Sequence, residues 1–299
     1  MKKILLFILS IISTTALFSC DNSGIVKAPK PDVIEKENLG DYGNVELAFP
    51  ILSDIHFSSI DNDAVMEYYP KALAYSMEET KNRLDAVIVA GDFSEGYEKD
   101  YDTLIALTRR EVGPEIPLIA SYGNHEGDGK HNFFIKKFNK QIDYVENVNG
   151  YNIIVLGAHA GNKYTKDQAK ALDTYLNLYT SEDPSKPVFV IVHHPVYDTH
   201  TNDFGNNEFR SVLDKYPQAF VICGHEHQFF SKASLWQGTF TSFRNAYLKN
   251  SEKGQYALLR ITDKNVIVIK KYEISPGDEK PHCIGDDIVI DFNEYLNSK

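Results

Sequence analysis

The sequence is poor in cysteine, with three among 299 residues, and no two of them stand at zinc-finger spacing. It also lacks the His-Glu-x-x-His pattern of helical zinc proteases, because Phe229 stands where a pattern starting at His225 needs its second histidine. Positive charge is in deficit: 31 Lys and Arg stand against 42 Asp and Glu, a formal net charge of −11. A chain this acidic repels polyanions, so we expect no binding of long nucleic acid.

Long apolar runs are also scarce, and the clearest lies near the N-terminus. Lys2 and Lys3 precede the apolar residues 4–12, a stretch too short to indicate a membrane-spanning helix but typical of an export signal. The segment ends in Leu17-Phe18-Ser19-Cys20 and resembles a bacterial lipoprotein signal. This resemblance implies cleavage before Cys20 and a lipid on its sulfur; the alternative is an ordinary secretory signal in which Cys20 is incidental.

The chain is therefore predicted to have three parts. Residues 1–19 are a signal peptide, residues 20–43 a polar tether containing Pro29 and Pro31, and residues 44–299 one folded domain. We expect the protein to be exported and anchored by lipid to a bacterial membrane, at the periplasmic face or the cell surface. Of the two remaining cysteines, Cys223 lies in an apolar run and is predicted to be a buried free thiol, whereas a bond to Cys283 stays open.

Strand and helix patterns alternate along most of the chain. The predicted strands are residues 45–52, 86–90, 117–121, 152–156, 187–192 and 219–223, followed by a strand-rich end at 232–236, 239–243, 256–261 and 266–272. The predicted helices are residues 71–83, 100–110, 131–139, 166–179 and 208–215, with Pro70 suited to a first turn. This order predicts an α/β layered domain with a mixed central sheet.

Five short polar segments each follow an apolar strand, where α/β sheets build their sites. They are Ser53-Asp54-Ile55-His56, Gly91-Asp92, Gly123-Asn124-His125-Glu126, His193-His194-Pro195 and Gly224-His225-Glu226-His227. Asp54 and His56 are two residues apart, so extended backbone would point both to one side and allow them to clasp one cation; His225 and His227 have the same option. Imidazoles, carboxylates and one amide oxygen suit Zn, Mn, Fe or Co better than Ca or Mg.

Taken in order, the five segments resemble the calcineurin-like metallophosphoesterase superfamily. Its pattern is Asp-x-His, Gly-Asp, Gly-Asn-His-Asp/Glu, His and Gly-His-x-His, and all five elements occur between Asp54 and His227. The resemblance implies a layered α/β/β/α domain with mixed central sheets. It also implies a hydrolase in which two metal ions, Mn, Fe or Zn, activate a hydroxide that cleaves a phosphomonoester or phosphodiester, with a small phosphoester as substrate.

The resemblance further implies which residues bind the ions. Asp54, His56, Asp92 and His227 would hold the first ion, and Asp92, Asn124, His193 and His225 the second, so Asp92 would bridge and take part in catalysis. His193 is preferred to His194 because the family's ligand stands two residues before the proline. His125 would contact the phosphate and protonate the leaving oxygen instead of binding metal.

The sequence departs from purple acid phosphatases within the same superfamily. Those enzymes carry a tyrosine three residues after the Gly-Asp aspartate, where this chain has Glu95, and they lack the histidine that is present here as His56. An iron–tyrosinate site is therefore not expected.

Other polar residues support weaker hypotheses. Glu126 and Glu226 are expected to support ligands or to face solvent, and Arg244 is expected at the surface, with a contact to substrate phosphate as the alternative. His159 could line the cleft or belong to a plain loop, and Tyr197 and His200 are weak pocket candidates. Two functions compete with hydrolysis of a small phosphoester: ligand binding by a lipoprotein without catalysis, and a nuclease, which the acidic charge disfavours.

Overall fold

The computed structural model describes residues 36–59, 64–127, 131–159, 164–200 and 207–299. The expected signal peptide and residues 20–35 of the expected tether, Cys20 among them, lie outside the described residues. Residues 36–299 cluster into one unit, which takes in residues 36–43. Within the described part of the chain, none of the helices has the length and apolar character needed to cross a membrane.

The first sheet has β1 near its middle. Its order is β12-β11-β10-β1-β2-β3, with β13 also paired to β11. The strands are β1 (Val45–Leu52), β2 (Val87–Val89), β3 (Leu118–Ala120), β10 (Gly254–Thr262), β11 (Val266–Ile274), β12 (His282–Cys283) and β13 (Ile288–Asp291). Strands β1, β2 and β3 run parallel, whereas β10 pairs antiparallel with β1, so the sheet is mixed.

The second sheet has four parallel strands between two antiparallel edges. Its order is β4-β5-β6-β7-β9-β8. The strands are β4 (Tyr144–Val148), β5 (Tyr151–Val155), β6 (Val188–Ile191), β7 (Ala219–Cys223), β8 (Leu235–Gln237) and β9 (Thr241–Arg244). The inner strands β6 and β7 are wholly buried, as expected for parallel strands covered on both faces.

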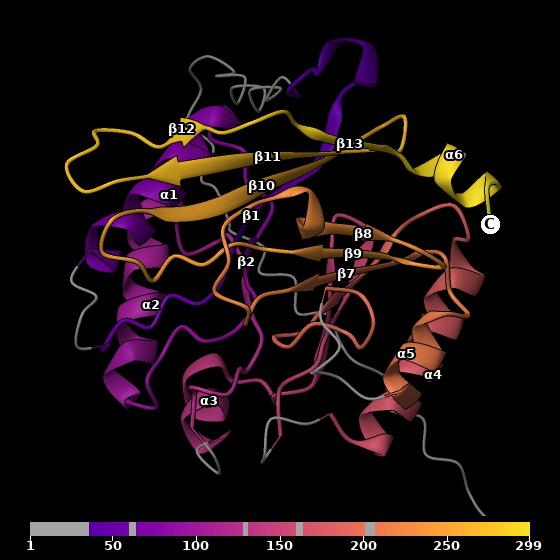
Figure 1. Cartoon of the computed structure of the whole chain (residues 1–299), viewed down its shortest axis with the longest axis horizontal. Helices are drawn as coiled ribbons and strands as arrows, with labels where there is room; N and C mark the ends of the chain where they lie inside the picture. The colour runs from indigo at the N-terminus through magenta and orange to yellow at the C-terminus, as the bar shows by residue number, and fades with distance from the viewer. Residues whose placement is uncertain (1–35, 60–63, 128–130, 160–163, 201–206) are drawn as a thin grey trace, which may run out of the picture. The chain divides into compact units, whose positions relative to one another are not determined.

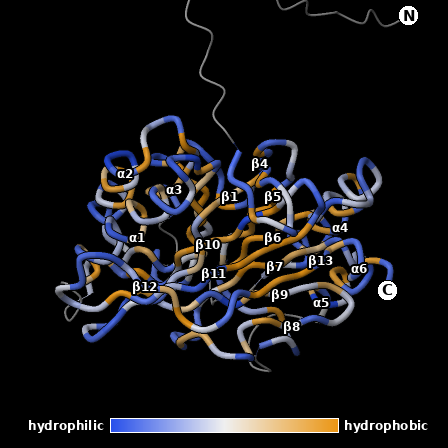
Figure 2. Tube along the Cα trace, turned by 90° about the horizontal axis from the view of Figure 1, so that it is seen from above, coloured by the Kyte–Doolittle hydropathy of each residue, from blue (hydrophilic) through white to orange (hydrophobic). Residues whose placement is uncertain are grey.

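Helices cover the outer face of each sheet. Helices α1 (Val65–Glu79), α2 (Glu98–Val112) and α3 (His131–Phe138) lie on one side, α4 (Lys166–Glu182) and α5 (Asn207–Leu213) on the other, and α6 (Phe292–Asn297) near the C-terminus (Figure 1). The apolar strands gather between the two sets of helices (Figure 2). Between the sheets, Phe49 packs edge-on against Phe189 with ring centroids 5.4 Å apart. The expected α/β/β/α layering with mixed sheets is confirmed.

Some element boundaries differ from the sequence prediction. The first helix begins at Val65, not at residue 71, and contains Pro70 in its interior. Proline has no amide hydrogen and so removes one backbone hydrogen bond of the helix. Burial of the neighbouring Tyr69 and Leu73 offsets the free energy that is lost. The segment predicted as a strand at 232–236 begins with a 3-10 turn, Lys232–Ser234. Strands β4, β12 and β13 and helix α6 were not predicted, because short edge elements carry weak periodicity.

Both cysteines of the described chain are free. Cys223 is buried in β7, as predicted, and Cys283 is exposed in β12.

Candidate metal centre

The polar segments that follow five strands converge at one edge of the two sheets. Residues after β1 and β2 in the first sheet meet residues after β6 and β7 in the second. Their ligand-type atoms form three groups, each lying within 4.8 Å. The groups are Asp54, His56, Asp92 and His227; Asp92, His193 and His225; and His56, Glu95 and His125.

The first group joins the ends of three strands. His227 Nε2 lies 3.2 Å from Asp54 Oδ1 and 3.2 Å from His56 Nε2. His56 Nε2 lies 3.9 Å from Asp92 Oδ2. Two carboxylates and two imidazole nitrogens therefore point at a common space, the arrangement of a cation site.

The second group shares Asp92 with the first. His193 Nε2 lies 3.0 Å from Asp92 Oδ2, and His225 Nδ1 lies 3.2 Å from His193 Nε2. The side-chain oxygen of Asn124 is buried without a hydrogen-bond partner among the described residues. Because a buried polar atom without a partner is unfavourable, the orphaned oxygen fits a ligand role for Asn124.

Hydrogen bonds behind these groups fix how the imidazoles are turned. His193 Nδ1 donates to the carbonyl of Ala90 at 2.8 Å, and His56 Nδ1 donates to Glu95 Oε1 at 2.8 Å. Both bonds leave Nε2 facing the cluster, as is usual for histidines that bind metal.

Glu126 hydrogen-bonds to the backbone of the loops that carry the candidate ligands. It is fully buried and accepts hydrogen bonds from the backbone amides of Asp92, Ser94 and Gly123. Burial, with the charge of Asp92 added, raises the pKa of Glu126 to about 8. Of the two roles expected for Glu126, supporting the ligands is the one the structure shows.

The backbone at the ligand positions is left-handed, so the expected strand geometry is wrong. Asp54, His56, Asp92, His225 and His227 have φ values of 53°, 51°, 52°, 74° and 47°. Each such residue costs about 1–3 kcal/mol, and the surrounding structure has to hold it in this conformation. Asp54 and His56 nevertheless lie in one group, as expected, whereas His225 and His227 lie in different groups: His227 joins Asp54 and His56, and His225 joins Asp92 and His193.

Two glycines allow segments of this edge to approach closely. Gly91 has φ +83°, and a Cβ there would stand 2.5 Å from His193 Nδ1. At Gly224, a Cβ would stand 2.6 Å from Asp54 Oδ2 and 2.8 Å from the side chain of Ser53. Both contacts are below van der Waals distance, so a side chain at either position would displace a candidate ligand.

Comparison with known proteins agrees with this geometry. The family model of the calcineurin-like phosphoesterases matches residues 49–229. The chain belongs to the calcineurin-like phosphoesterase family. It is therefore a hydrolase of the metal-dependent phosphoester-cleaving class, and the matched range contains all eight residues predicted for the site.

A solved structure with similarity to this phosphoesterase is a protein serine/threonine phosphatase from Saccharomyces cerevisiae, described as similar to human phosphatase PP5. It has 12% sequence identity and a TM-score of 0.39, and the match covers 79% of this chain and 83% of that chain. No curated protein matches the sequence.

Protonation in the phosphoesterase site suits metal binding. Burial lowers the pKa of His56 and of His225 to about 4, so both imidazoles are neutral at pH 7. Burial alone would lower the pKa of His193 as well, but the adjoining Asp92 carboxylate raises it to about 10. Neutral imidazole is the metal-binding form, so a cation at this place would have to displace the proton that His193 shares with Asp92.

Among the other predicted positions, Arg244 differs from expectation. Arg244 is not at the surface: it is 2% exposed and donates to Gln228 Oε1 at 2.9 Å. His194 is buried, with its ring 4.2 Å from that of His225. His159 contacts Asp143 at 3.4 Å and belongs to none of the three groups. Both ring nitrogens of His200 make hydrogen bonds, to the carbonyl of Ala233 and to the hydroxyl of Ser242, and His200 belongs to none of the three groups.

The sequence prediction missed two residues at the site. Glu95 was noted only as a departure from tyrosine, yet it contacts both His56 and His125. Lys249 was not considered, and its ammonium group lies 3.5 Å from Glu95 Oε1. The spacing of three residues from Asp92 was a usable signal for Glu95, whereas nothing local in the sequence marks Lys249.

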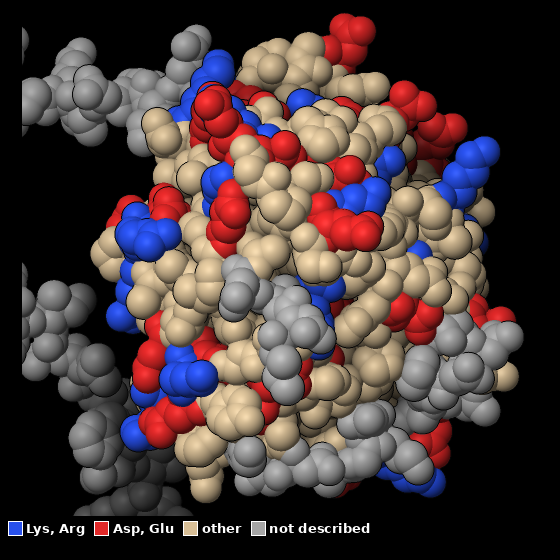
Figure 3. Space-filling model, turned by 60° about the vertical axis from the view of Figure 1, so that its left-hand side comes forward, with Lys and Arg blue, Asp and Glu red and all other residues tan. Residues whose placement is uncertain are grey.

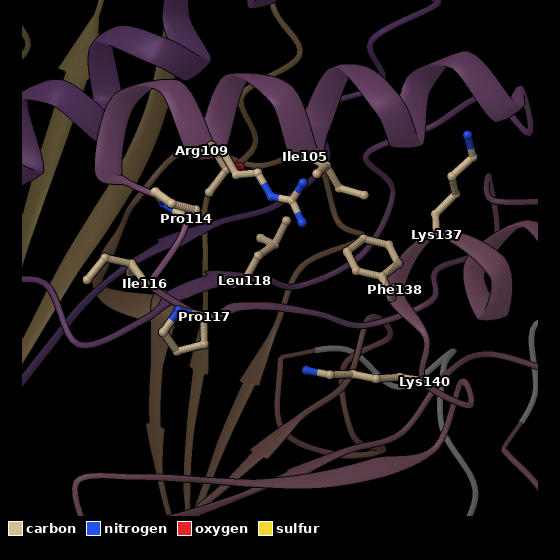
Figure 4. Close-up of a pocket in the computed structure, with 10 residues that line it drawn as sticks. Ile105, Arg109, Pro114, Ile116, Pro117, Leu118, Lys137, Phe138 and Lys140 are labelled. Atoms are coloured by element: carbon tan, nitrogen blue, oxygen red, sulfur yellow. The ribbon is translucent and has the colours of Figure 1, made fainter. Parts of the chain in front are cut away.

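An unrelated pocket lies between α2, β3 and the end of α3. It has a volume of about 160 Å³, and its lining combines apolar side chains such as Ile105, Leu118 and Phe138 with the basic side chains of Arg109 and Lys137 (Figure 4). None of its lining residues belongs to the three groups, so it is separate from the metal centre.

Proposed function

We propose that this phosphoesterase cleaves a small phosphate ester with two metal ions held at the strand ends. Asp54, His56, Asp92 and His227 would hold one ion, and Asp92, Asn124, His193 and His225 the other. The observation that carries this proposal is the position of Asp92, whose Oδ2 lies 3.0 Å from His193 Nε2 and 3.9 Å from His56 Nε2. A carboxylate between two sets of ligands is what a bridged pair of ions requires.

The chemistry follows from this ligand set. Two divalent or transition ions, when bound, lower the pKa of a water molecule and neutralise charge on the phosphoryl oxygens. The mixture of imidazole, carboxylate and amide donors supports Mn, Fe or Zn. Asp92 is itself fixed, because its Oδ1 accepts the backbone amide of His125 at 2.9 Å.

His125 is proposed to act on the leaving group. Its side chain is 40% exposed, more than those of His56 and His193, and its Nδ1 donates to Glu95 Oε2 at 2.8 Å. This bond leaves Nε2 as the nitrogen that can meet a substrate. An imidazole so placed can hold a proton for the departing oxygen.

The test is metal analysis of the purified protein followed by a substrate panel. Chelator-treated protein should lose hydrolysis of p-nitrophenyl phosphate or its bis-ester and regain it with added Mn, Fe or Zn. If metal-replete protein leaves a broad phosphoester panel intact, ligand binding without catalysis becomes the better proposal. Cleavage of single-stranded DNA would instead favour a nuclease. The described part of the face in Figure 3 gives that alternative no support, because its basic side chains are interspersed with acidic ones and form no basic patch.

We also propose that the protein is exported and held at a bacterial membrane by lipid on Cys20, as the N-terminal sequence predicts. The measurement is detergent partitioning of cells that express the full chain. Cys20→Ser should move the protein from the membrane fraction to the soluble fraction; retention of the variant at the membrane would contradict a lipid anchor.

A further inference from the structure

The segment after β9 is bonded directly to the first metal-ligand loop. The amide of Leu248 donates to the carbonyl of Ser53 at 3.2 Å, and the amide of Lys249 donates to the carbonyl of Asp54 at 2.9 Å. These bonds fix the backbone of Lys249 beside a candidate ligand, although 195 positions of sequence numbering separate Lys249 from Asp54. The position of Lys249 is therefore as well defined as that of the loop itself.

The side chain of Lys249 reaches the group formed by His56, Glu95 and His125. Its Nζ lies 3.5 Å from Glu95 Oε1, and 28% of the side chain is exposed. Among the residues that the structure describes, it is the one Lys or Arg that forms an ion pair with any residue of the three groups. The site therefore has a protein cation at its accessible side, next to the histidine proposed to meet the leaving group.

The pairing with Glu95 leaves the ammonium group incompletely satisfied. A charge-assisted hydrogen bond has a usual length of about 2.7–2.9 Å, so 3.5 Å is a loose contact. An ammonium group has three donors, and Glu95 is the one side-chain partner of Lys249 in the described part of the chain. Donors thus remain for a ligand.

We propose that Lys249 binds a phosphoryl oxygen of the substrate and directs the site towards phosphomonoesters. This inference rests on the proposed function and adds a substrate class to it. A phosphomonoester carries up to two negative charges near neutral pH, whereas a diester carries one. Asp54, Asp92 and Glu95 each bring one negative charge to the site, and Lys249 brings a positive side-chain charge that opposes them on the side of Glu95. The ammonium group of Lys249 therefore stabilises a bound monoester, with its second negative charge, more than a bound diester.

The test compares Lys249→Met with Lys249→Arg and with Lys280→Met. Lys280 is 59% exposed and pairs with Glu78 on α1, so its variant makes the same change in net charge away from the site. Each metal-loaded protein is titrated with inorganic phosphate by calorimetry. Each is also assayed with p-nitrophenyl phosphate and its bis-ester, and its metal content is measured.

Lys249→Met should weaken phosphate binding by about 10- to 100-fold, the effect of losing a hydrogen bond to a charged group. KM for the monoester should rise similarly and that for the diester by less than about threefold, since less charge is opposed. Lys249→Arg should retain most binding, and Lys280→Met all of it. Equal losses on both esters, unchanged phosphate affinity, or lost metal in Lys249→Met would overturn the inference.

The binding arm separates this inference from the proposed function. If no phosphoester is cleaved by the unaltered protein but Lys249→Met still weakens phosphate binding, Lys249 is a phosphate ligand in a site that is not hydrolytic. If esters are cleaved and Lys249→Met changes neither phosphate affinity nor KM, the proposed function stands and the role of Lys249 is wrong.

Discussion

Glu95 holds His125 through a 2.8 Å hydrogen bond between its Oε2 and the Nδ1 of the imidazole. Its other oxygen makes a bond of the same length to Nδ1 of His56. One carboxylate therefore orients a candidate metal ligand and the candidate proton donor together. In the proposed arrangement Glu95 binds neither ion and does not contact the reacting atoms, so it would act as a positioning residue.

Replacing Glu95 by Gln should reduce kcat by about 10- to 100-fold, the usual cost of losing a partner behind a ligand. The side-chain amide of glutamine has one acceptor oxygen, whereas the N–H groups of His56 and His125 each need an acceptor. The loss should be larger for poor leaving groups, because His125 is misdirected. Glu98→Gln, at a half-exposed residue paired with Lys136 and Lys137 away from the three groups, is the matched control. An equal loss of kcat for good and poor leaving groups would mean that Glu95 stabilises the structure of the site and does not orient His125 for proton donation.

His125→Ala should slow esters with poor leaving groups more than activated esters. General acid assistance contributes typically about 10²- to 10⁴-fold, and an activated leaving group needs little of it. A series of aryl phosphates of rising leaving-group pKa measures this dependence as a slope. His282→Ala, at an exposed histidine of β12, should leave the slope unchanged. Equal slowing of every ester by His125→Ala would remove its role as acid.

Asp92→Asn should abolish turnover and weaken retention of both ions. The change keeps the shape of the side chain and removes the charge that faces both His193 and His56. Metal content after gel filtration and kcat are the two measurements. Asp102→Asn, at a 61% exposed carboxylate paired with Lys137, serves as the control. Near-normal activity with full metal content would contradict the bridging position.

Gly224→Ala should lower both stability and metal content. The added methyl group would stand 2.6 Å from Asp54 Oδ2, so Asp54 or the loop must move. Overpacking of this kind costs about 1–3 kcal/mol. Gly277→Ala provides the contrast for metal content: nothing lies within 4 Å of its Cβ position, but its φ of +83° is strained for alanine, so this variant should lose stability without losing metal. Gly224→Ala protein with unchanged metal content and thermal unfolding would show that the close approach is dispensable.

The stability of the fold should depend on pH through Glu79. Burial opposes ionisation of Glu79, but the hydrogen bond from Tyr272 and the charges of Lys270 and Arg260 outweigh it and leave its pKa below the usual value. A carboxylate with a lowered pKa stabilises the fold above its unfolded-state pKa and loses this effect as the pH falls through the folded-state pKa.

Glu79→Gln should therefore reduce the free energy of unfolding by about 1–3 kcal/mol at pH 7. The difference from the unaltered protein should shrink as the pH falls below the ordinary glutamate pKa of 4.5, because the carboxyl then becomes neutral in both states. Urea unfolding of metal-free protein across this range measures the difference. A difference that stays constant with pH would show that the charge of Glu79 does not contribute.

The buried strands and the residues that follow them could be predicted from sequence. Strands β1 and β7 have the predicted bounds, since each is a mostly apolar run followed by polar residues. The backbone that brings the ligands together could not be predicted, because left-handed residues after a strand leave no periodic signal. Nor could the burial of Arg244 or the position of Lys249, since their surroundings come from segments far along the chain.

The left-handed backbone has a consequence for how chains of this kind change over generations. Asn, Asp and His are the side chains other than glycine that most often occupy this conformation. At Asp54, His56, Asp92, His225 and His227, the needs of the backbone and those of a cation therefore favour the same few residues. A descendant that no longer bound metal would still be selected for these residue types at several of the positions. In such a chain, the presence of these residue types would reflect the conformation of the turns. Metal binding would be indicated only by side chains that point at a common space.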